Sequence, residues 1–265
     1  MNYQQIIFTV EKSIARIALN RPEAYNAFSD IMLSELSDVI DYIHKDKKIR
    51  VVVITGTGKA FCSGGDVKAM VERCHSGLTF QERRDIIRNN QAVMVQKIKS
   101  IHQPVIAAIN GVAVGAGCSL ALACDLRIAS DKAKLGLVFV KRGLIPDWGA
   151  NYFLPRLIGI SNALELVLTG RIIDAQTALR MGLVNKVVTH EELEESVNQI
   201  CEEIAQNAPL AVTGAKDAVY YGAIHDLASS LEYDAYVQSM CQLTEDHKEG
   251  VMSFVEKRPA IFVGK

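Results

Sequence analysis

The sequence has little that would direct the chain to a membrane or to nucleic acid. Its 265 residues carry 29 Lys and Arg against 30 Asp and Glu, a formal net charge of −1, and so near-neutral a balance does not favour a polyanionic partner. No apolar run approaches the roughly 18 residues of a membrane span. The first residues, MNYQQIIFTVEK, lack the features of a secretory signal. We therefore expect a cytoplasmic protein with no membrane or nucleic-acid partner.

Cysteine and histidine are sparse and scattered. The six cysteines, at positions 62, 74, 118, 124, 201 and 241, form no CxxC pair, which argues against a disulfide scaffold. The six histidines show no spacing typical of metal ligands. We therefore expect reduced thiols and no bound metal.

Short apolar runs alternate with helical patterns over most of the chain. Residues 5–10 and 14–19 predict two strands around a turn. VVVIT (51–55) and VIAAI (105–109) are runs typical of strands buried on both faces of a parallel sheet. Residues 29–44 have apolar positions every three or four residues, which predicts a helix. Such an alternation indicates an α/β domain.

Near residue 190 the alternation of strand and helix patterns gives way to helix patterns alone. Thr189 to Glu192 has the pattern of a capping box, and helical spacing of apolar residues continues from there to the end. We therefore divide the chain into an α/β core, residues 1–190, and a helical region, residues 191–265. Apolar faces on such a helical region favour packing on another subunit, so we expect an oligomer.

Two glycine-containing stretches follow buried strands. KAFCSGGD (59–66) follows the strand at 51–55, and NGVAVGAG (110–117) leads from the strand at 105–109 into a short apolar helix. Because α/β sheets place their sites at the carboxyl ends of strands, one N–H from each stretch could converge on an oxyanion. Each stretch alone can also be explained without a functional role. The first would then be an ordinary loop, and the second a site of close helix–strand packing.

The stretch GLIPDWGANYFLPRL (143–157) holds a lone carboxylate, Asp147, among apolar neighbours. Burial raises the pKa of a carboxylate that lacks strong donors, and this makes it a better base. Aspartate is also a favoured N-cap, and a helix is expected to begin near Trp148. Spacing alone leaves both roles open.

Several motifs together resemble the enoyl-CoA hydratase/isomerase family, also called the crotonase superfamily, from about residue 5 to the end. They are NRPEAYNAFS (20–29), GKAFCSGGD (58–66), INGVAVGAGCSLALACDLRIAS (109–130), LTGRIIDAQTALRMGLVNKVV (168–188) and FVEKRPAIF (254–262). The resemblance implies an α/β fold, a crotonase-like spiral of ββα units with a C-terminal helical trimerisation region. It also implies a homotrimer or a hexamer, a dimer of trimers. The core would bind an acyl-CoA thioester, and no separate cofactor is implied because coenzyme A is part of the substrate.

The roles known in that family fall on particular residues of this sequence. The oxyanion-hole N–H groups fall on Gly65 and Ala116, which would hold the thioester oxygen and stabilise an enolate. The C-terminal basic pair falls on Lys257 and Arg258, which would reach the CoA phosphates from the same or a neighbouring subunit. The other implied CoA-binding positions are Arg21, Glu23, Ala24, Ala60, Phe61, Ser63 and Asp66.

Two positions in the acyl site depart from the hydratases of the family. Those enzymes use two glutamates, which fall here on Ser119 and Phe139, so water cannot be activated in the usual way. Asp147 falls where single-carboxylate members carry their acid. This resembles the Δ3,Δ2-enoyl-CoA isomerases and, in the surrounding pattern, the ring-1,2-epoxyphenylacetyl-CoA isomerases. The 4-chlorobenzoyl-CoA dehalogenases also need a histidine on the preceding helix, and residues 79–100 contain none.

The sequence therefore predicts an acyl-CoA isomerase of fatty-acid or phenylacetate metabolism. Asp147 would take a proton from C2 and return it at C4, moving a double bond from Δ3 to Δ2, or would serve the rearrangement of a ring epoxide. Two alternatives stay open. One is an enoyl-CoA hydratase of fatty-acid or amino-acid breakdown with an atypical water activator, and the other is a non-catalytic relative that binds acyl-CoA or RNA.

Overall fold

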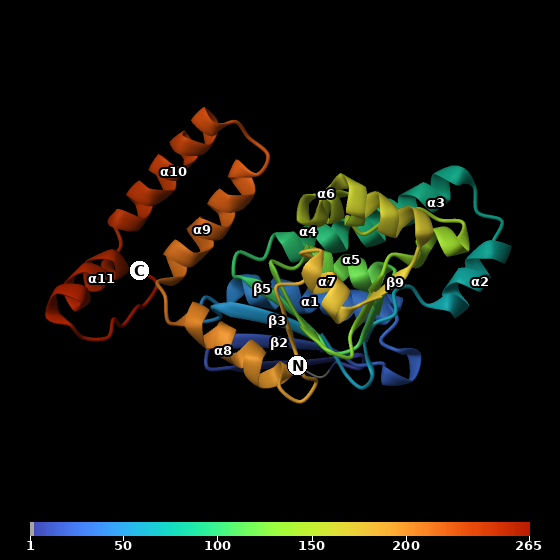
Figure 1. Cartoon of the computed structure of the whole chain (residues 1–265), viewed down its shortest axis with the longest axis horizontal. Helices are drawn as coiled ribbons and strands as arrows, with labels where there is room; N and C mark the ends of the chain where they lie inside the picture. Colours follow the sequence, from blue (N-terminus) through green and yellow to red (C-terminus); the bar gives the residue numbers. More distant parts are fainter. Residues whose placement is uncertain (1–2) are drawn as a thin grey trace.

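Two β-sheets and the helices around them form the core of the molecule (Figure 1). The computed structural model describes residues 3–265, apart from the side chains of residues 90–92. A six-stranded sheet has the order β1-β2-β3-β5-β7-β10, and a four-stranded sheet has the order β4-β6-β8-β9. The strands are β1 (Ile6–Glu11), β2 (Ile14–Leu19), β3 (Val51–Gly56), β4 (Ala60–Cys62), β5 (Val105–Ile109), β6 (Val112–Val114), β7 (Leu126–Ser130), β8 (Lys134–Gly136), β9 (Ile172–Asp174) and β10 (Lys186–Val188).

The chain alternates between the two sheets in repeated units. β3, β5 and β7 are neighbours and parallel in the larger sheet, and each is followed by a short strand of the smaller sheet, β4, β6 and β8. After β4 and β6, helical segments return the chain to the larger sheet, whereas after β8 they lead to β9 of the smaller sheet and then, through α7, to β10. This arrangement confirms the expected ββα spiral. The strands predicted at 51–55 and 105–109 are confirmed, and every residue of β5 is buried.

The helices mostly follow the predicted ranges. The helix predicted at 29–44 is α1, and the Ser29 side chain caps it by accepting a hydrogen bond from the Met32 N–H at 3.2 Å. Residues 79–100, which alternate charged and apolar positions as in a helix, are helical over 80–99, but a π-helical segment separates α3 from α4. The helical elements are η1 (Pro22–Ala24), α1 (Asp30–Lys45), α2 (Val67–His75), α3 (Phe80–Ile86), η2 (Ile87–Ala92), α4 (Val93–Lys99), α5 (Ala116–Ala123), η3 (Val138–Arg142), α6 (Ala150–Thr169), α7 (Ala175–Arg180), α8 (Leu193–Ala205), α9 (Pro209–Gly222), α10 (Leu227–Gln242) and α11 (Glu245–Glu256).

Helix α8 packs against the larger sheet and does not extend away from it with the helices that follow. Its buried Val197 and Cys201 pack in one apolar cluster with Val53 of β3. The Thr189 hydroxyl donates to the Glu192 carboxylate at 2.8 Å, but the helix begins only at Leu193, so Thr189 is not its N-cap. The sequence places the change of character at residue 190, whereas the helices that leave the sheet begin with α9 (Figure 1).

A buried carboxylate, Asp125, fastens α9 to the core. Lys216 and Tyr220 of α9 reach its oxygens at 2.7 and 2.8 Å, and Lys99 at the end of α4 adds a third contact at 3.2 Å. The Asp125 side chain is only 13% exposed. Burial works to raise the pKa of Asp125, but the two ammonium groups outweigh it and lower the pKa below its ordinary value. This cluster holds the second half of α9 against the core.

The C-terminal helices α9, α10 and α11 extend away from the sheets (Figure 1). No described residue of α9 or α10 is buried. A groove of about 980 Å³ lies between the three helices and the end of the chain, and its lining includes Leu210, Val237, Val251, Phe254 and Phe262. Over residues 3–265, none of the helices is long and apolar enough to cross a bilayer.

Candidate active site

The loop after β4 and the start of α5 meet closely, as the sequence predicts for Gly65 and Ala116. Gly64 has φ +94°, and a Cβ there would lie 2.9 Å from the Val114 carbonyl oxygen and 3.1 Å from the Ala116 nitrogen. A Cβ on Gly117 would lie 2.1 Å from the Cys62 carbonyl oxygen. Only glycine fits at either point, because a Cβ essentially never comes within 3.0 Å of backbone. The two glycines therefore let the two loops touch.

The backbone N–H groups of this junction are available to a ligand. Ala116 is the first residue of α5, so its N–H has no intrahelical acceptor and lies at the positive end of the helix dipole. Within residues 3–265, neither the Gly65 N–H nor the Ala116 N–H donates to a protein group. Two such donors on adjoining loops can hold one oxyanion.

Asp147 lies in the turn between η3 and α6. Of the two roles that the spacing leaves open, Asp147 is not the N-cap of α6, because this helix begins at Ala150 and its N-cap is Gly149. The Ala150 N–H donates to the Asp147 carbonyl at 3.0 Å, and the Asn151 amide donates to the Pro146 carbonyl at 2.6 Å. Asp147 is half-buried, and its Oδ1 is shielded from solvent. Hydrogen bonds to the carbonyls of Pro146 and Asp147 thus hold the turn, and Asp147 stands two residues before the N-cap of α6.

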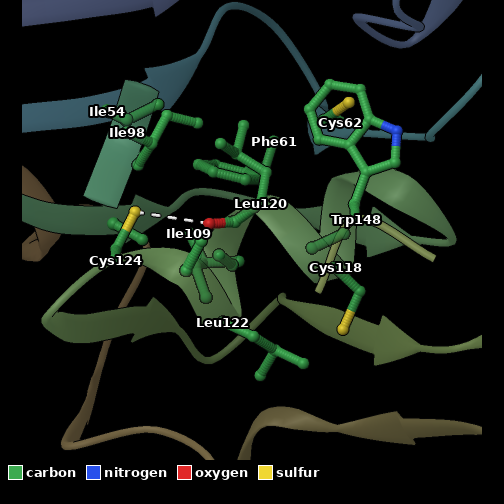
Figure 2. Close-up of a cluster of buried hydrophobic side chains, with 14 of the residues drawn as sticks. Ile54, Phe61, Cys62, Ile98, Ile109, Cys118, Leu120, Leu122, Cys124 and Trp148 are labelled. Atoms are coloured by element: carbon green, nitrogen blue, oxygen red, sulfur yellow. Dashed lines mark hydrogen bonds between the residues drawn. The ribbon is translucent and has the colours of Figure 1, made fainter. Parts of the chain in front are cut away.

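An aromatic contact connects the Asp147 turn to the oxyanion loop. The Trp148 ring stacks on the Phe28 ring, with centroids 4.4 Å apart and planes 11° from parallel. Phe28 in turn donates its N–H to the Gly64 carbonyl at 2.8 Å and forms an isolated parallel bridge with Gly65. Figure 2 shows Trp148 at the edge of the buried cluster that contains Cys62 and Cys118. The three predicted catalytic residues therefore belong to one contiguous group of contacts.

The two positions where the sequence lacks glutamates are both buried. Ser119 on α5 is fully buried, and its hydroxyl donates to the Gly115 carbonyl at 3.3 Å. Phe139 on η3 is 9% exposed and belongs to the main apolar cluster. Neither side chain can exchange a proton with a substrate at neutral pH.

The cysteines near the junction are not nucleophiles. Cys62 and Cys118 are buried, and burial raises the pKa of each thiol to about 12, so neither is a thiolate at neutral pH. All six cysteines are free. Within the described residues, no group of three or more His, Cys, Asp or Glu side chains is placed to hold a metal ion.

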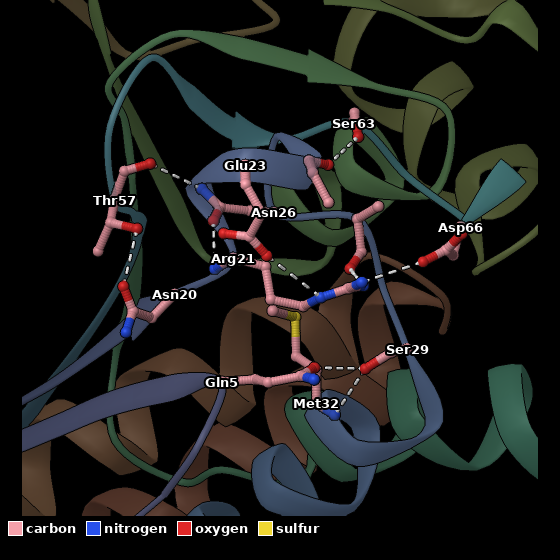
Figure 3. Close-up of polar contacts among 12 residues, drawn as sticks. Gln5, Asn20, Arg21, Glu23, Asn26, Ser29, Met32, Thr57, Ser63 and Asp66 are labelled. Atoms are coloured by element: carbon pink, nitrogen blue, oxygen red, sulfur yellow. Dashed lines mark hydrogen bonds and ion pairs between the residues drawn. The ribbon is translucent and has the colours of Figure 1, made fainter. Parts of the chain in front are cut away.

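Two of the predicted CoA-binding residues are joined to each other. The Arg21 guanidinium donates to the Asp66 carboxylate at 3.1 Å and to the Ala27 carbonyl at 2.8 Å (Figure 3). Burial works to raise the pKa of Asp66, but hydrogen bonds from the Lys68 N–H and from Arg21 lower it on balance. Asp66 also caps α2 through Lys68. The pair therefore ties the loop after β2 to the oxyanion loop.

The remaining residues of this group lie along the same edge but differ in what they present. Ser63 contacts the loop after β2, its hydroxyl donating to the Ala24 carbonyl at 3.3 Å. Glu23 is exposed, with 73% of its side chain accessible. Ala60 and Phe61 are buried in β4, and the Phe61 ring points into the core, so these two offer backbone only (Figure 2).

The basic pair Lys257–Arg258 is not brought to this site within one chain. Both residues follow α11, which lies at the opposite end of the molecule from α2 (Figure 1). Arg258 is engaged by the Glu249 carboxylate at 2.5 and 2.8 Å and by Glu256 at 2.6 Å. Lys257 follows the last turn of α11 and is exposed.

Three residues that organise the site are not among the sequence predictions. Asn26 is fully buried and donates to the carbonyls of Thr57 and Ala60 at 2.9 and 2.8 Å, and it accepts from the Arg21 N–H. Phe28 and Trp148 form the stack described above. Asn26 and Phe28 lie within the motif NRPEAYNAFS, and the single tryptophan is next to the lone aspartate. These two sequence features, the motif and the tryptophan beside Asp147, could have pointed to the three residues.

Comparison with known proteins places the chain in a family. The model of the enoyl-CoA hydratase/isomerase family matches residues 9–265. The chain is 40% identical over 268 residues to the crotonyl-CoA hydratase of Syntrophomonas wolfei, with both chains covered in full. It is 37% identical over 259 residues to the short-chain-enoyl-CoA hydratase of Clostridium acetobutylicum, with 97% of each covered. The solved enoyl-CoA hydratase from Bacillus anthracis matches with a TM-score of 0.93 at 39% identity, covering 99% of this chain and 100% of that one.

The protein is an enzyme of the enoyl-CoA hydratase/isomerase family, with the crotonase fold. Both the family and the fold implied by the sequence motifs are therefore confirmed.

Proposed function

We propose that this enzyme is an acyl-CoA isomerase that moves a double bond from Δ3 to Δ2 through a thioester enolate. The observation that carries the proposal is the series of contacts from Trp148, next to Asp147, through Phe28 to the loop of Gly65, which adjoins the start of α5 at Ala116. The hydratase glutamate positions, Ser119 and Phe139, offer no second carboxylate. One base and one oxyanion site suffice for a proton transfer between C2 and C4.

The proposed reaction has two proton transfers and no net change in atoms. The Asp147 carboxylate takes a proton from C2 of a 3-enoyl-CoA, and the electron pair moves into the thioester carbonyl to give a dienolate. The Gly65 and Ala116 N–H groups hold the dienolate oxygen, and the dipole of α5 favours its negative charge. Asp147 then returns the proton to C4, and the double bond forms between C2 and C3.

The proposed substrate class, an acyl-CoA thioester, is supported by residues beside the oxyanion loop. The Arg21–Asp66 pair and the backbone of Ala60 to Ser63 lie beside the oxyanion loop, where the CoA arm would run. Lys257 would meet the CoA phosphates of a neighbouring subunit, because it directly follows α11, which lies at the opposite end of the molecule from α2 (Figure 1). Ring-1,2-epoxyphenylacetyl-CoA is a second substrate that a single carboxylate and an oxyanion hole could serve.

A hydratase is the second candidate function, and the relatives favour it. The similar proteins from Syntrophomonas wolfei, Clostridium acetobutylicum and Bacillus anthracis carry hydratase names. In this chain a hydratase would have to activate water with Asp147 alone. Comparing the rate of water addition to crotonyl-CoA with the rate of isomerisation of a 3-enoyl-CoA separates the two functions.

The substitution Asp147→Asn tests the proposed base. Asparagine has nearly the same size but cannot accept the proton, so we expect kcat for isomerisation to fall by roughly 10²–10⁴. Binding of the CoA thioester should change little, because the donors are backbone groups. The matched control is Asp38→Asn on the exposed face of α1, which should leave kcat unchanged. Near-normal turnover of the Asp147 variant, with the control also normal, would return Asp147 to a structural role.

We further propose that the enzyme works as a homotrimer or a dimer of trimers. Helices α9 and α10 have no buried residue in the single chain, and the groove beside them is largely apolar. Leu227, Leu231 and Tyr236 of α10 are at least 58% exposed. A second copy of the chain would cover them, since exposed apolar surface of this extent favours association. Sedimentation at micromolar concentration should show a multiple of 29.1 kDa, and a monomer alone would contradict this proposal.

A further inference from the structure

Trp148 has a backbone conformation that its side chain disfavours. Its φ is +51°, in the left-handed region, where a bulky residue is strained. A glycine would adopt this conformation freely, as the adjacent Gly149 does at φ +74°. The indole must therefore contribute something that offsets the strain. The ring is 5% exposed, and its stacking partner is Phe28.

Phe28 contacts both halves of the proposed site. Its ring stacks on Trp148, which directly follows Asp147. Its N–H holds the Gly64 carbonyl at 2.8 Å, and it bridges Gly65, which carries an oxyanion donor. Phe28 also precedes the N-cap of α1, so its backbone is anchored at the start of a 16-residue helix. A short and rigid path thus leads from the carboxylate to the oxyanion site.

The other side of the Asp147 turn is joined to α6 through two backbone carbonyls. The contacts are those from Ala150 to the Asp147 carbonyl and from Asn151 to the Pro146 carbonyl. These hydrogen bonds fix the turn to α6. They do not fix it relative to the loop of Gly65, which belongs to a different sheet element. The aromatic stack supplies that second connection.

We propose that the Phe28–Trp148 stack sets the position of the Asp147 carboxylate relative to the Gly65 N–H. Trp148 and Phe28 would then be positioning residues for proton transfer, without touching the substrate themselves. This inference rests on the proposed function. It adds that the geometry of the acid–base step is set by a ring contact between the loop before α1 and the loop before α6.

The test compares variants that keep and remove the stack. Trp148→Phe keeps a ring over Phe28, whereas Trp148→Leu keeps apolar bulk without a ring. We expect the Leu variant to lose about 10- to 100-fold in kcat, because a misplacement of about 1 Å can cost that much. KM should stay within about threefold, and the Phe variant should recover most of the loss. A Leu variant that turns over as well as the Phe variant, or one that loses binding in proportion to kcat, overturns the proposal.

A second variant keeps the test valid if Trp148→Leu does not fold. Phe28→Leu removes the stack from the other side and leaves the N–H to the Gly64 carbonyl in place, so kcat should fall similarly. Phe8→Leu is the matched control, since Phe8 packs edge-on against Tyr42 at 5.5 Å on β1 and α1, outside the site. A Phe28→Leu protein that folds with unchanged kcat overturns the proposal.

Tryptophan fluorescence gives a readout that does not depend on turnover. Trp148 is the only tryptophan, so its emission reports on this turn alone. The emission should shift in Phe28→Leu and stay unchanged in Phe8→Leu. The Asp147→Asn variant distinguishes a failure of the proposed catalytic role of Asp147 from a failure of the proposed role of the stack. If it abolishes turnover while both Leu variants remain active, only the stack inference fails. If it remains active, the proposed function fails first.

Discussion

Replacing Gly64 by alanine would force apart the two loops that form the proposed oxyanion site. The new Cβ would lie 2.9 Å from the Val114 carbonyl oxygen and 3.1 Å from the Ala116 nitrogen. Both obstacles are backbone atoms and cannot rotate away. Lengthening the 2.9 Å contact to an ordinary 3.4 Å requires the loops to separate by about 0.5 Å. The Gly65 and Ala116 donors would then no longer converge on one oxygen.

The expected loss follows from the energy of one oxyanion donor. Removing one typically lowers kcat by about 10²–10³, or about 2.7–4 kcal/mol. We expect a loss of this size for Gly64→Ala in isomerisation of a 3-enoyl-CoA, followed by the absorbance of the conjugated thioester product. The left-handed φ of +94° adds a folding cost of roughly 1–2 kcal/mol, which lowers Tm.

The substitution Gly77→Ala provides the control for backbone strain. Gly77 also has a left-handed φ, +63°, but a Cβ there would meet nothing within 4 Å. It should therefore show a similar folding cost with unchanged kcat. The two-loop geometry is refuted if Gly64→Ala keeps kcat within about tenfold of the wild type while its Tm matches that of Gly77→Ala.

Two further predictions concern the anchor of α9 and the missing glutamates. Asp125→Asn leaves the largely shielded ammonium groups of Lys99 and Lys216 without their carboxylate, so stability should fall by roughly 3–5 kcal/mol, measured by Tm. Because folding lowers the pKa of Asp125, its contribution is present above the unfolded value of about 3.9 and is lost as pH falls through the folded value. The two proteins should therefore converge in Tm in acid, and a difference that does not shrink there contradicts the assignment. Ser119→Glu combined with Phe139→Glu should raise hydration of crotonyl-CoA at least about tenfold if water activation is what is missing; wild-type hydration as fast as isomerisation would contradict this.

Asp147 shows where sequence reasoning reached its limit. Pattern alone left a base and a helix cap open, because both use a carboxylate near a helix start. The structure excludes the cap, since α6 begins at Ala150 after Gly149. The catalytic role remains the proposal tested above. A shift of two residues in a helix boundary is finer than periodicity can resolve.

Periodicity by itself determined the longer strands of the larger sheet and most helices, because these patterns depend on neighbouring residues along the chain. The motifs determined the family in the same way. The short strands of the smaller sheet, β4, β6, β8 and β9, were not predicted. The contact of Gly117 with the Cys62 carbonyl, the stack of Phe28 on Trp148 and the anchoring of α9 were decided only by tertiary structure. Each joins segments far apart in the sequence, and no local pattern encodes the distance between two loops on different strands. Close packing of the sheets and helices sets that distance, and with it the shape of the site.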